Sequence, residues 1–445
     1  MVMNIELFKS ILLALLVVLS GVLTWNVWSY QPDYVIIERT ETVDISIAAE
    51  KDIQDLVKPN RILVHNGEEV YGTPSDIEIN QLIDMMKGWT LFNVRNISSE
   101  VSEEEFKNLV HGPDRVEILF PTETPFETYR EVLRFEDSNL PSATFDRIVV
   151  QLDEREGDTL NIYFVLYEDR IVHEAKVSDS VMVQFNREVI QPASQEFQRY
   201  FSYDAGGQRT LFLPSQSTNA IQYKYWMNFY DPGQFQDALF SDPSLVNRNP
   251  LGPNGNEEQY IDGSSLMKVD LVNRMLNYVN PSSETEIGAI PSDLIQKSRR
   301  FVNEHEGWTD DYRLFSINPE EQQITYRIHE QGHPVFNNEG IAQIDQEWGE
   351  TRIYKYDRSF MGLDVRLPSQ TETKALPTGD AVISNLEKQP NFDPALLEDV
   401  IIGYHMTRDI ENSILYTLEP MWYYKYKGSW QQVPIEGGGN PVGLE

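Results

Sequence analysis

The chain has 445 residues, and its 70 acidic and 36 basic side chains give a formal net charge of −34. Such a surface repels phosphate backbones, which argues against nucleic acid as a partner, and the absence of cysteine excludes disulfides, thiolate-bound zinc and a thiol nucleophile. With 40% hydrophobic and 11% aromatic residues, the chain is expected to fold.

A stretch without charged side chains runs from residue 10 to residue 28. As a helix that rises about 1.5 Å per residue, it would span roughly 28 Å, close to the hydrocarbon thickness of a bilayer. Cleavage as a secretory signal is the alternative, but such signals have apolar regions of about 7–15 residues followed by an A-x-A-like site. We therefore predict a retained transmembrane helix at 10–28, with Trp25, Trp28 and Tyr30 as interfacial anchors.

The residues that flank this helix predict its orientation. Lys9 and the amino terminus precede it, and basic residues beside a membrane helix favour the cytoplasmic side. Residues 1–9 are therefore expected to form a short cytoplasmic tail, and the long acidic body is expected outside the cell. The predicted location is the cell membrane, crossed once.

Mostly small residues follow one side of the predicted helix. Their positions step by four and three alternately, as in a left-handed helix pair, and small side chains let helix backbones approach closely in lipid. Membrane helices also contain small residues by composition alone, which is the competing interpretation. The candidate partner-contact face consists of Ser10, Ala14, Val17, Gly21 and Thr24, continued by Trp28.

The rest of the chain predicts an α+β fold with mainly antiparallel sheets, in three domains at residues 33–195, 196–290 and 291–435, followed by a flexible tail at 436–445. Hydrophobic periodicity and turn residues define the elements. The first domain is expected to contain a hairpin at 61–71, a helix within 73–89, a helix with a Ser102–Glu105 capping box and a hairpin at 147–167.

The second and third domains have fewer clear helices. The second is expected to contain a strand at 223–230, a short helix at 231–242, a turn-rich excursion at 247–259 and a further strand within 264–281. The third is expected to contain a helix from Pro291, strands at 311–317, 322–329 and 351–357, a helix at 381–389, and strands at 400–406 and 414–426. Pro420 predicts an edge or a bulge in the last strand.

One short motif suggests chemistry, because residues 329–333 spell H-E-x-x-H. Two histidines four residues apart converge on one zinc ion only on a helix. Here apolar and polar residues alternate up to Ile328, which is typical of a strand, and Gly332 and Pro334 mark a turn. We therefore predict a hairpin that carries two surface histidines, and no metal site.

No other segment predicts a catalytic group or a cofactor. Asp310 and Asp311 are adjacent acids, which usually form a solvated turn. The aromatic stretch 421–426 could stack against a sugar or a peptide, but such a run is more often half core and half interface on a sheet. The chain is expected to be non-enzymatic.

Several strings in the sequence resemble the YycH (WalH) family of Gram-positive bacteria. The resemblance extends over essentially the whole chain. It is carried by the anchor that continues into LTWNVWSYQPDY, by SRRFVNEHEGWTDDYRL, by GHPVF after a strand, and by DVIIGYHM followed by LEPMWYYKY.

This resemblance implies a single-pass membrane protein that acts with a sister protein, YycI, on the sensor histidine kinase YycG, also called WalK. That kinase belongs to the WalKR (YycFG) system, which controls cell-wall metabolism, and the family regulator acts on it largely through transmembrane helices. The implied extracellular part is an elongated array of three α+β domains. Two alternatives remain: an exported enzyme, and a wall-binding or ligand-binding surface protein anchored by one helix.

Overall fold

The computed structural model describes residues 48–434 except 157, 207–208, 253–254, 285–287 and 306, together with residues 9, 13, 15–21 and 23–25. The side chains of 153–156 are also outside this description. Contacts divide the chain into two units, Met1–Ile45 and Ser46–Glu445. We call the second unit the body.

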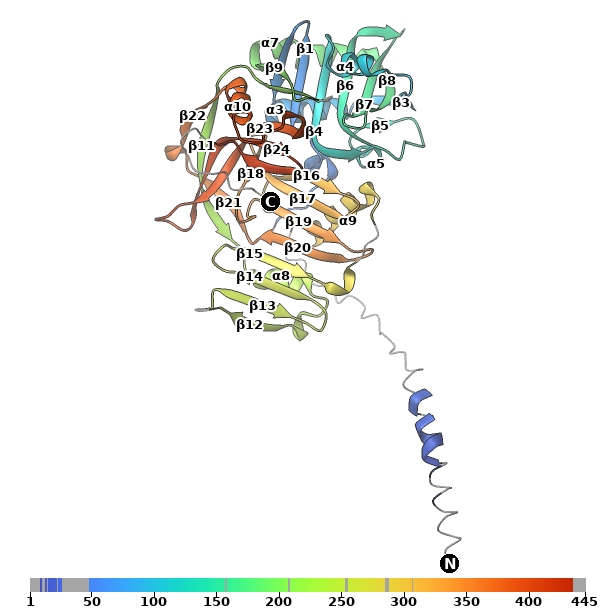
Figure 1. Cartoon of the computed structure of the whole chain (residues 1–445), viewed down its shortest axis with the longest axis vertical. Helices are drawn as coiled ribbons and strands as arrows, with labels where there is room; N and C mark the ends of the chain where they lie inside the picture. Colours follow the sequence, from blue (N-terminus) through green and yellow to red (C-terminus); the bar gives the residue numbers. More distant parts are fainter. Residues whose placement is uncertain are drawn as a thin grey trace, which may run out of the picture. The chain divides into compact units, whose positions relative to one another are not determined.

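The first sheet of the body has ten strands, and β3 and β5 are its parallel pair (Figure 1). Their order is β10-β9-β2-β1-β4-β6-β7-β8-β3-β5. The strands are β1 (Arg61–Asn66), β2 (Glu69–Thr73), β3 (Thr90–Asn96), β4 (Arg115–Pro125), β5 (Arg134–Phe135), β6 (Thr144–Glu156), β7 (Thr159–Leu166), β8 (Ile171–Ser178), β9 (Gln198–Asp204) and β10 (Thr210–Pro214).

The second sheet is longer and continues away from the first, with β12 and β13 at its far end (Figure 1). Its main path is β12-β13-β14-β15-β20-β19-β17-β18-β23-β24-β11-β21, and β16, β22 and β25 pair with β17, β11 and β24. The strands are β11 (Thr218–Phe229), β12 (Asn247–Leu251), β13 (Glu257–Ile261), β14 (Leu266–Asp270), β15 (Met275–Val279), β16 (Tyr312–Asn318), β17 (Gln323–Glu330), β18 (His333–Phe336), β19 (Gln343–Trp348), β20 (Ile353–Ser359), β21 (Met361–Arg366), β22 (Glu372–Leu376), β23 (Leu397–Arg408), β24 (Leu415–Tyr426) and β25 (Ser429–Gln432).

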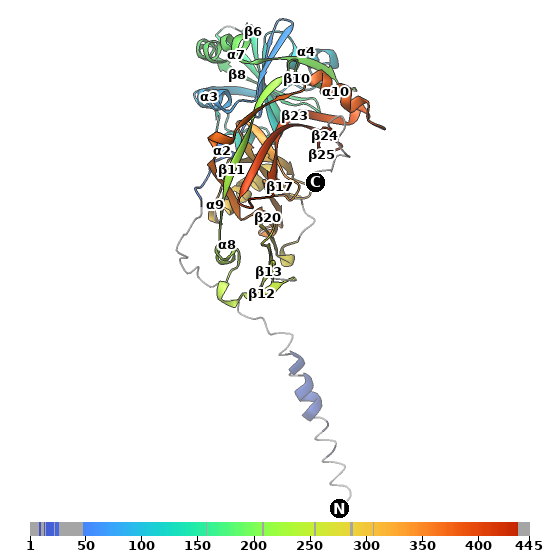
Figure 2. The ribbon, with the colours of Figure 1, turned by 90° about the vertical axis from the view of Figure 1, so that its left-hand side faces the viewer.

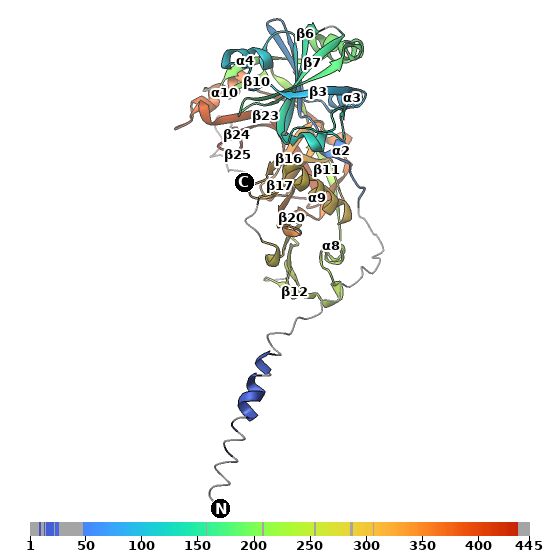
Figure 3. The ribbon, with the colours of Figure 1, turned by 90° about the vertical axis from the view of Figure 1, so that its right-hand side faces the viewer.

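Helices cover the two sheets. In chain order they are α2 (Ile53–Leu56), α3 (Asp76–Met86), α4 (Glu103–His111), α5 (Phe126–Tyr129), α6 (Met182–Phe185), α7 (Gln191–Glu196), α8 (Pro232–Leu239), α9 (Pro291–Glu304) and α10 (Gly379–Glu387). Figure 2 shows α8 beside the far end of the second sheet, and Figure 3 shows α2 above α9.

Both faces of the first sheet are packed, because successive strand residues point to opposite sides. On β6, Ile148 belongs to the main hydrophobic cluster, whereas its neighbour Val149 packs in a separate cluster with Phe106 and Val110 of α4. The main cluster also contains residues of the second sheet, such as Tyr326. The two sheets therefore share one continuous hydrophobic core, and the fold is α+β with mainly antiparallel sheets, as predicted.

Most of the predicted elements are confirmed. The 61–71 hairpin is β1–β2, and the apolar face of α3 is buried. Ser102 Oγ accepts the Glu105 amide, while the Glu105 carboxylate accepts the Ser102 amide at 2.9 Å, which is the expected capping box. Strands β6 and β7 form the second hairpin. The helices expected in the later domains are α8, α9 and α10.

The middle of the chain contains strands that the sequence analysis did not predict. The turn-rich excursion at 247–259 is the β12–β13 hairpin, in which every β12 residue is exposed and Pro250 lies opposite Glu258. A proline is tolerated there because β12 is the end strand of the sheet. The segment 198–214, assigned to the second domain, supplies β9 and β10 to the first sheet. The three domain boundaries themselves remain predictions.

The expectation for Pro420 is met locally. It pairs with Tyr404 of β23. On the other side of β24, the pairing with β11 ends at Leu418 and the pairing with β25 begins at Tyr423. Within the described residues, Pro420 therefore lies in a short stretch where β24 has a strand on one side, so its missing amide hydrogen costs no ladder bond.

Candidate functional site

Three residues of the predicted partner-contact face lie in the described part of the N-terminal unit. Val17, Gly21 and Thr24 are helical and exposed, and the Thr24 hydroxyl donates to the Ser20 carbonyl at 2.8 Å. This bond satisfies a polar side chain within its own helix. Trp25 is also helical and exposed. Ser10, Ala14, Trp28 and Tyr30 lie outside the described residues.

Among the described residues, no helix is both long and apolar enough to cross a membrane. The predicted transmembrane helix and its contact face therefore remain predictions.

The H-E-x-x-H string forms a hairpin, as predicted. Strands β17 and β18 pair Glu330 with His333, and Gln331 and Gly332 have the positive φ angles of a two-residue turn, 52° and 83°. The expectation of surface histidines is wrong, because His329 is only 6% exposed and bonds the Arg327 carbonyl. His333 bonds the Ile402 carbonyl at 3.1 Å. The two histidines therefore hold backbone groups.

The turn of this hairpin docks on the first sheet. A Cβ atom at Gly332 would lie 1.9 Å from the Pro74 carbonyl oxygen, in the loop between β2 and α3. Beside this contact, a cavity of about 250 Å³ is lined by residues of both sheets, among them Arg61, Tyr200 and Trp422. Arg61 also forms an ion pair with Asp399 of β23 at 3.2 Å. The motif is therefore part of the joint between the sheets.

Burial of His329 predicts an acid-sensitive joint. Burial, with repulsion from Arg313, lowers the pKa of His329 to about 3. Between that value and the unfolded pKa of about 6.5, the unfolded chain binds the extra proton, so stability falls as the pH falls. In urea unfolding, the wild-type midpoint should drop between pH 6.5 and 4.5, and His329→Asn, whose amide can reach the same carbonyl, should drop less. If the urea midpoints of wild type and His329→Asn fell equally between these two pH values, the prediction would be wrong.

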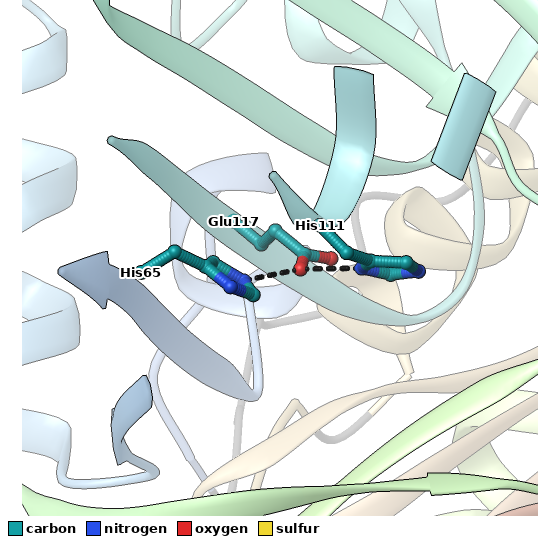
Figure 4. A group of neighbouring side chains, drawn as sticks. All are labelled: His65, His111 and Glu117. Carbon is teal, nitrogen blue, oxygen red and sulfur yellow. Dashed lines mark hydrogen bonds and ion pairs between the residues drawn. The ribbon is translucent and has the colours of Figure 1, made fainter. Parts of the chain in front are cut away.

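A cluster that the sequence analysis did not identify lies on one face of the first sheet. Glu117 of β4 is fully buried, and its Oε1 atom lies 2.6 Å from His65 Nε2 and 2.8 Å from His111 Nδ1 (Figure 4). In the strand register Leu63 faces Glu117, so His65 of β1 is its diagonal neighbour on the same face. Arg147 of β6 is the diagonal neighbour on the other side and donates to Glu117 Oε2 at 3.1 Å.

The electrostatics of this cluster fix the direction of its hydrogen bonds. Burial alone would raise the pKa of Glu117, but His111 and His65 hold it well below its usual range. An ionised carboxylate only accepts hydrogen bonds, so both histidines donate to it. His111 then uses Nε2 to bond the Tyr167 hydroxyl at 2.7 Å, and the oxygen of Tyr167 accepts the Thr210 amide at 3.3 Å.

The three side chains are the one group among the described residues whose ligand atoms lie close enough together to be considered for a metal ion. Their geometry favours hydrogen bonding. Ligands of a tetrahedral zinc ion, each at about 2.1 Å, stand roughly 3.4 Å apart, which exceeds both nitrogen–oxygen distances to Glu117 given above. Arg147 also occupies the second carboxylate oxygen. We interpret the cluster as a closed hub that joins β1, β4, β6 and the end of α4.

The adjacent acids Asp310 and Asp311 do not form the solvated turn that was expected. Burial raises the pKa of Asp310 to about 6, and its carboxylate accepts the Leu363 amide at 2.8 Å. Asp311 bonds the Arg313 guanidinium at 2.5 Å, and Arg313 also pairs with Asp76 of α3 at 2.7 Å. Both acids therefore have structural partners, although the Asp311 side chain is 42% exposed.

The aromatic stretch 421–426 is mainly core. Trp422 and Tyr424 pack against the helix α10, and Tyr423 stacks on Phe336 at 4.0 Å between ring centres on the opposite face. Next to it, a polar groove of about 560 Å³ crosses the open face of the second sheet. Its lining includes Arg327, Asp345, Asp357, Lys425 and Trp430.

Side chains on the floor of the polar groove already bond one another. Thr325 and Gln343 donate to the two oxygens of Asp345, both at 2.6 Å. Asp357 faces Asp345 across the strands and pairs with Lys355 at 3.0 Å. These polar side chains of the groove therefore have partners within the groove itself.

Comparison with known proteins places these features in a family. The models for the N-terminal and C-terminal domains of YycH protein match residues 6–191 and 208–437. The two-component system WalR/WalK regulatory protein YycH of Bacillus subtilis (strain 168) is 25% identical over 453 residues, covering 97% of each chain. The crystal structure of YycH from Bacillus subtilis matches 88% of this chain and 100% of its own, with a TM-score of 0.74 and 20% identity. This chain therefore belongs to the YycH family.

Proposed function

We propose that this protein is a non-enzymatic regulator of the sensor histidine kinase in a WalR/WalK two-component system, which controls cell-wall metabolism. The observation that carries the proposal is the match to a regulatory protein of that system along 97% of both chains. The match to the model for the N-terminal domain of the family begins at residue 6, so it includes most of the N-terminal segment as well as the body. The closed hydrogen bonding of the Glu117 cluster, which leaves no reactive group facing a substrate, is consistent with a role without catalysis.

The proposed location is the cell membrane, with residues 1–9 in the cytoplasm, one pass at 10–28 and the body outside the cell. In this proposal the regulator informs the kinase through its membrane helix. Within lipid, helices associate through close packing of small residues. In this proposal the face that includes Val17, Gly21 and Thr24 contacts the helices of the kinase and of the sister protein YycI, a partner that the family resemblance implies.

Replacing Gly21 by leucine tests this contact face. The added side chain overpacks the face, which costs about 1–3 kcal/mol, so contact with the partner helices should weaken roughly tenfold. Site-directed cross-linking to the kinase and to YycI, together with a WalR/WalK-dependent transcription reporter, measures the effect. Leu19 lies about 200° around the helix from both Val17 and Gly21, so Leu19→Phe adds bulk on the opposite side as a matched control.

Exchange of residues 10–28 for an unrelated membrane helix tests whether regulation depends on the sequence of this helix at all. If the exchanged chain regulates the reporter normally, regulation does not use the helix, and the proposed mechanism is wrong. If the exchange abolishes regulation but Gly21→Leu leaves cross-linking and output unchanged, the helix acts through another face.

A wall-binding or ligand-binding surface protein is the second candidate, and the polar groove favours it. An aromatic wall at Trp430 beside carboxylates and amides is suited to a polar ligand. Such a protein would work with any anchor, so normal function after the helix exchange would support this alternative.

A further inference from the structure

The first described residues of the body are held by the loop that follows α9. Asn303 of α9 accepts the Lys51 amide at 3.1 Å through Oδ1 and donates to the Lys51 carbonyl at 3.2 Å through Nδ2. One side chain thus satisfies both backbone groups of Lys51, as a neighbouring strand would. Figures 2 and 3 show α2, which follows directly, close to α9.

Two further residues complete this contact. The Trp308 indole donates to Asn303 Oδ1 at 2.6 Å, and the Trp308 amide approaches the Ala49 carbonyl at 3.5 Å. Gly307 has a φ of 70°, and a Cβ atom there would lie 2.5 Å from the Ala48 carbonyl oxygen. The chain can therefore pass over the loop only because position 307 has no side chain. We call Asn303, Gly307 and Trp308 the clamp.

Charged groups reinforce the clamp. The Lys51 ammonium lies 3.4 Å from Asp311 and donates to the Tyr312 carbonyl at 3.3 Å. Arg299 of α9 reaches Asp52 at 3.4 Å. Burial lowers the pKa of Lys51, although Asp311 opposes the shift. Ile53, two residues after Lys51, is fully buried in the core.

The clamp is joined to the core of the second sheet. The Gly307 carbonyl accepts a hydrogen bond at 3.2 Å from Arg358, a fully buried arginine of β20. Trp308 packs edge-to-face on Tyr326 of β17, with 4.8 Å between the ring centres. A rearrangement in that sheet would therefore displace the groups that hold Ala48, Ala49 and Lys51.

We propose that Asn303, Gly307 and Trp308 are positioning residues for regulation, because they hold Ala48, Ala49 and Lys51, the part of the described body that is nearest in sequence to the N-terminal helix. This inference rests on the proposed function. If the helix is the output element, a change in the body can reach it along the chain, and the clamp holds the first described residues of the body on that route. It also gives the SRRFVNEHEGWTDDYRL string a physical role, since the clamp lies within it.

Asn303→Ala in the full chain tests the inference. The variant leaves both backbone groups of Lys51 without the side chain that bonds them. We expect exchange of the amides between Ala49 and Val57 to rise about tenfold by hydrogen-exchange mass spectrometry. Reporter output should move toward that of cells lacking the protein. Trp308→Phe, which removes the indole donor and keeps an aromatic ring, should have the same effects to a smaller degree.

Asn337→Ala is the matched control. Asn337 also makes three hydrogen bonds, donating to the Met406 carbonyl and accepting the amides of Glu339 and Ile341, but it has no bond to residues 48–57. This variant should leave both the exchange of that segment and the reporter output at wild-type levels. An equal change of output in Asn337→Ala would overturn the proposal, because general loss of stability would then explain the result.

The helix exchange separates this inference from the proposed function. If the exchange changes the output while Asn303→Ala and Trp308→Phe speed up amide exchange without changing the output, the clamp does not position the helix. If the exchange itself leaves the output normal, the proposed function fails, and the clamp proposal fails with it. If Asn303→Ala does not fold, amide exchange and reporter output are measured on Trp308→Phe instead, and the same outcomes support or overturn the proposal.

Discussion

Replacing Glu117 by glutamine is expected to lower the free energy of unfolding of the body by about 3 kcal/mol, because the change removes a fully buried carboxylate that pairs with the Arg147 guanidinium and accepts from two histidines, and leaves Asp146 as the remaining anion beside Arg147. Arg147 donates to the carboxylate at 3.1 Å, and both partners are largely buried. Glutamine has nearly the same shape, so the variant removes the charge and leaves the packing intact. Urea unfolding of the full chain, followed by circular dichroism, measures the loss.

A matched control for this variant is available in the same half of the body. Glu127 pairs with Arg130 at 3.5 Å, and the Glu127 side chain is 62% exposed. Exposed ion pairs contribute little, so Glu127→Gln should change the free energy of unfolding by less than about 0.5 kcal/mol. If the two variants lost similar free energies of unfolding, burial would not increase the contribution of Glu117 to stability.

The pH dependence of the Glu117 effect has a definite sign. The folded protein holds the pKa of Glu117 well below its usual range, so its contribution is fully present above the unfolded value of about 4.3. That contribution is lost as the pH falls toward the folded value. The difference in unfolding midpoint between wild type and Glu117→Gln should therefore be largest near neutral pH and should shrink in acid.

The sequence predicts individual elements well because their signals are local. The face formed by Ile79, Leu82, Ile83 and Met86 repeats at the helical period, and all four residues are buried in α3. The Ser102–Glu105 box depends on residues three apart, and Gly67 supplies the positive φ of its own hairpin turn. Each of these signals is complete within a few residues, so tertiary context does not alter it.

The Glu117 cluster could not be predicted in the same way, because its members come together through strand register. His65, His111 and Glu117 lie on β1, α4 and β4, and only the offset between the two strands places His65 beside the carboxylate. The clamp is also nonlocal, since Asn303 and Lys51 are 252 positions apart. The membership of the β9–β10 pair in the first sheet is a third case, because β9 joins that sheet through β2, which lies far away in the sequence.

The H-E-x-x-H string shows how local reasoning can give the right backbone and the wrong environment. Alternation up to Ile328 and the Gly332–Pro334 turn correctly predict the β17–β18 hairpin. Exposure is a tertiary property, and His329 is buried where β17 lies beside the segment at Asp311, whose carbonyl accepts the His329 amide. The pattern of residues therefore predicts the backbone of the hairpin, but it carries no information on whether the two histidines are exposed.

Gly332→Ala is expected to disrupt the joint between the two sheets. The added methyl group would lie 1.9 Å from the Pro74 carbonyl oxygen, and the φ of 83° disfavours any residue with a side chain. The turn and the β2–α3 loop must separate, so the loss of stability should exceed the cost of the φ angle alone, which is about 1 kcal/mol. Amide exchange in α3 and β18 should rise together.

Gly67→Ala isolates the conformational part of this effect. Gly67 also has a positive φ, 62°, in a two-residue hairpin turn, but a Cβ atom there would have no neighbour within 4 Å. Its loss in stability should therefore report strain alone, and the excess in Gly332→Ala should report the contact between the sheets. If the two variants lose the same stability, the close approach of Gly332 to Pro74 adds nothing, and the sheets are joined mainly by their shared hydrophobic core and by ion pairs such as Arg61–Asp399 and Arg313–Asp76.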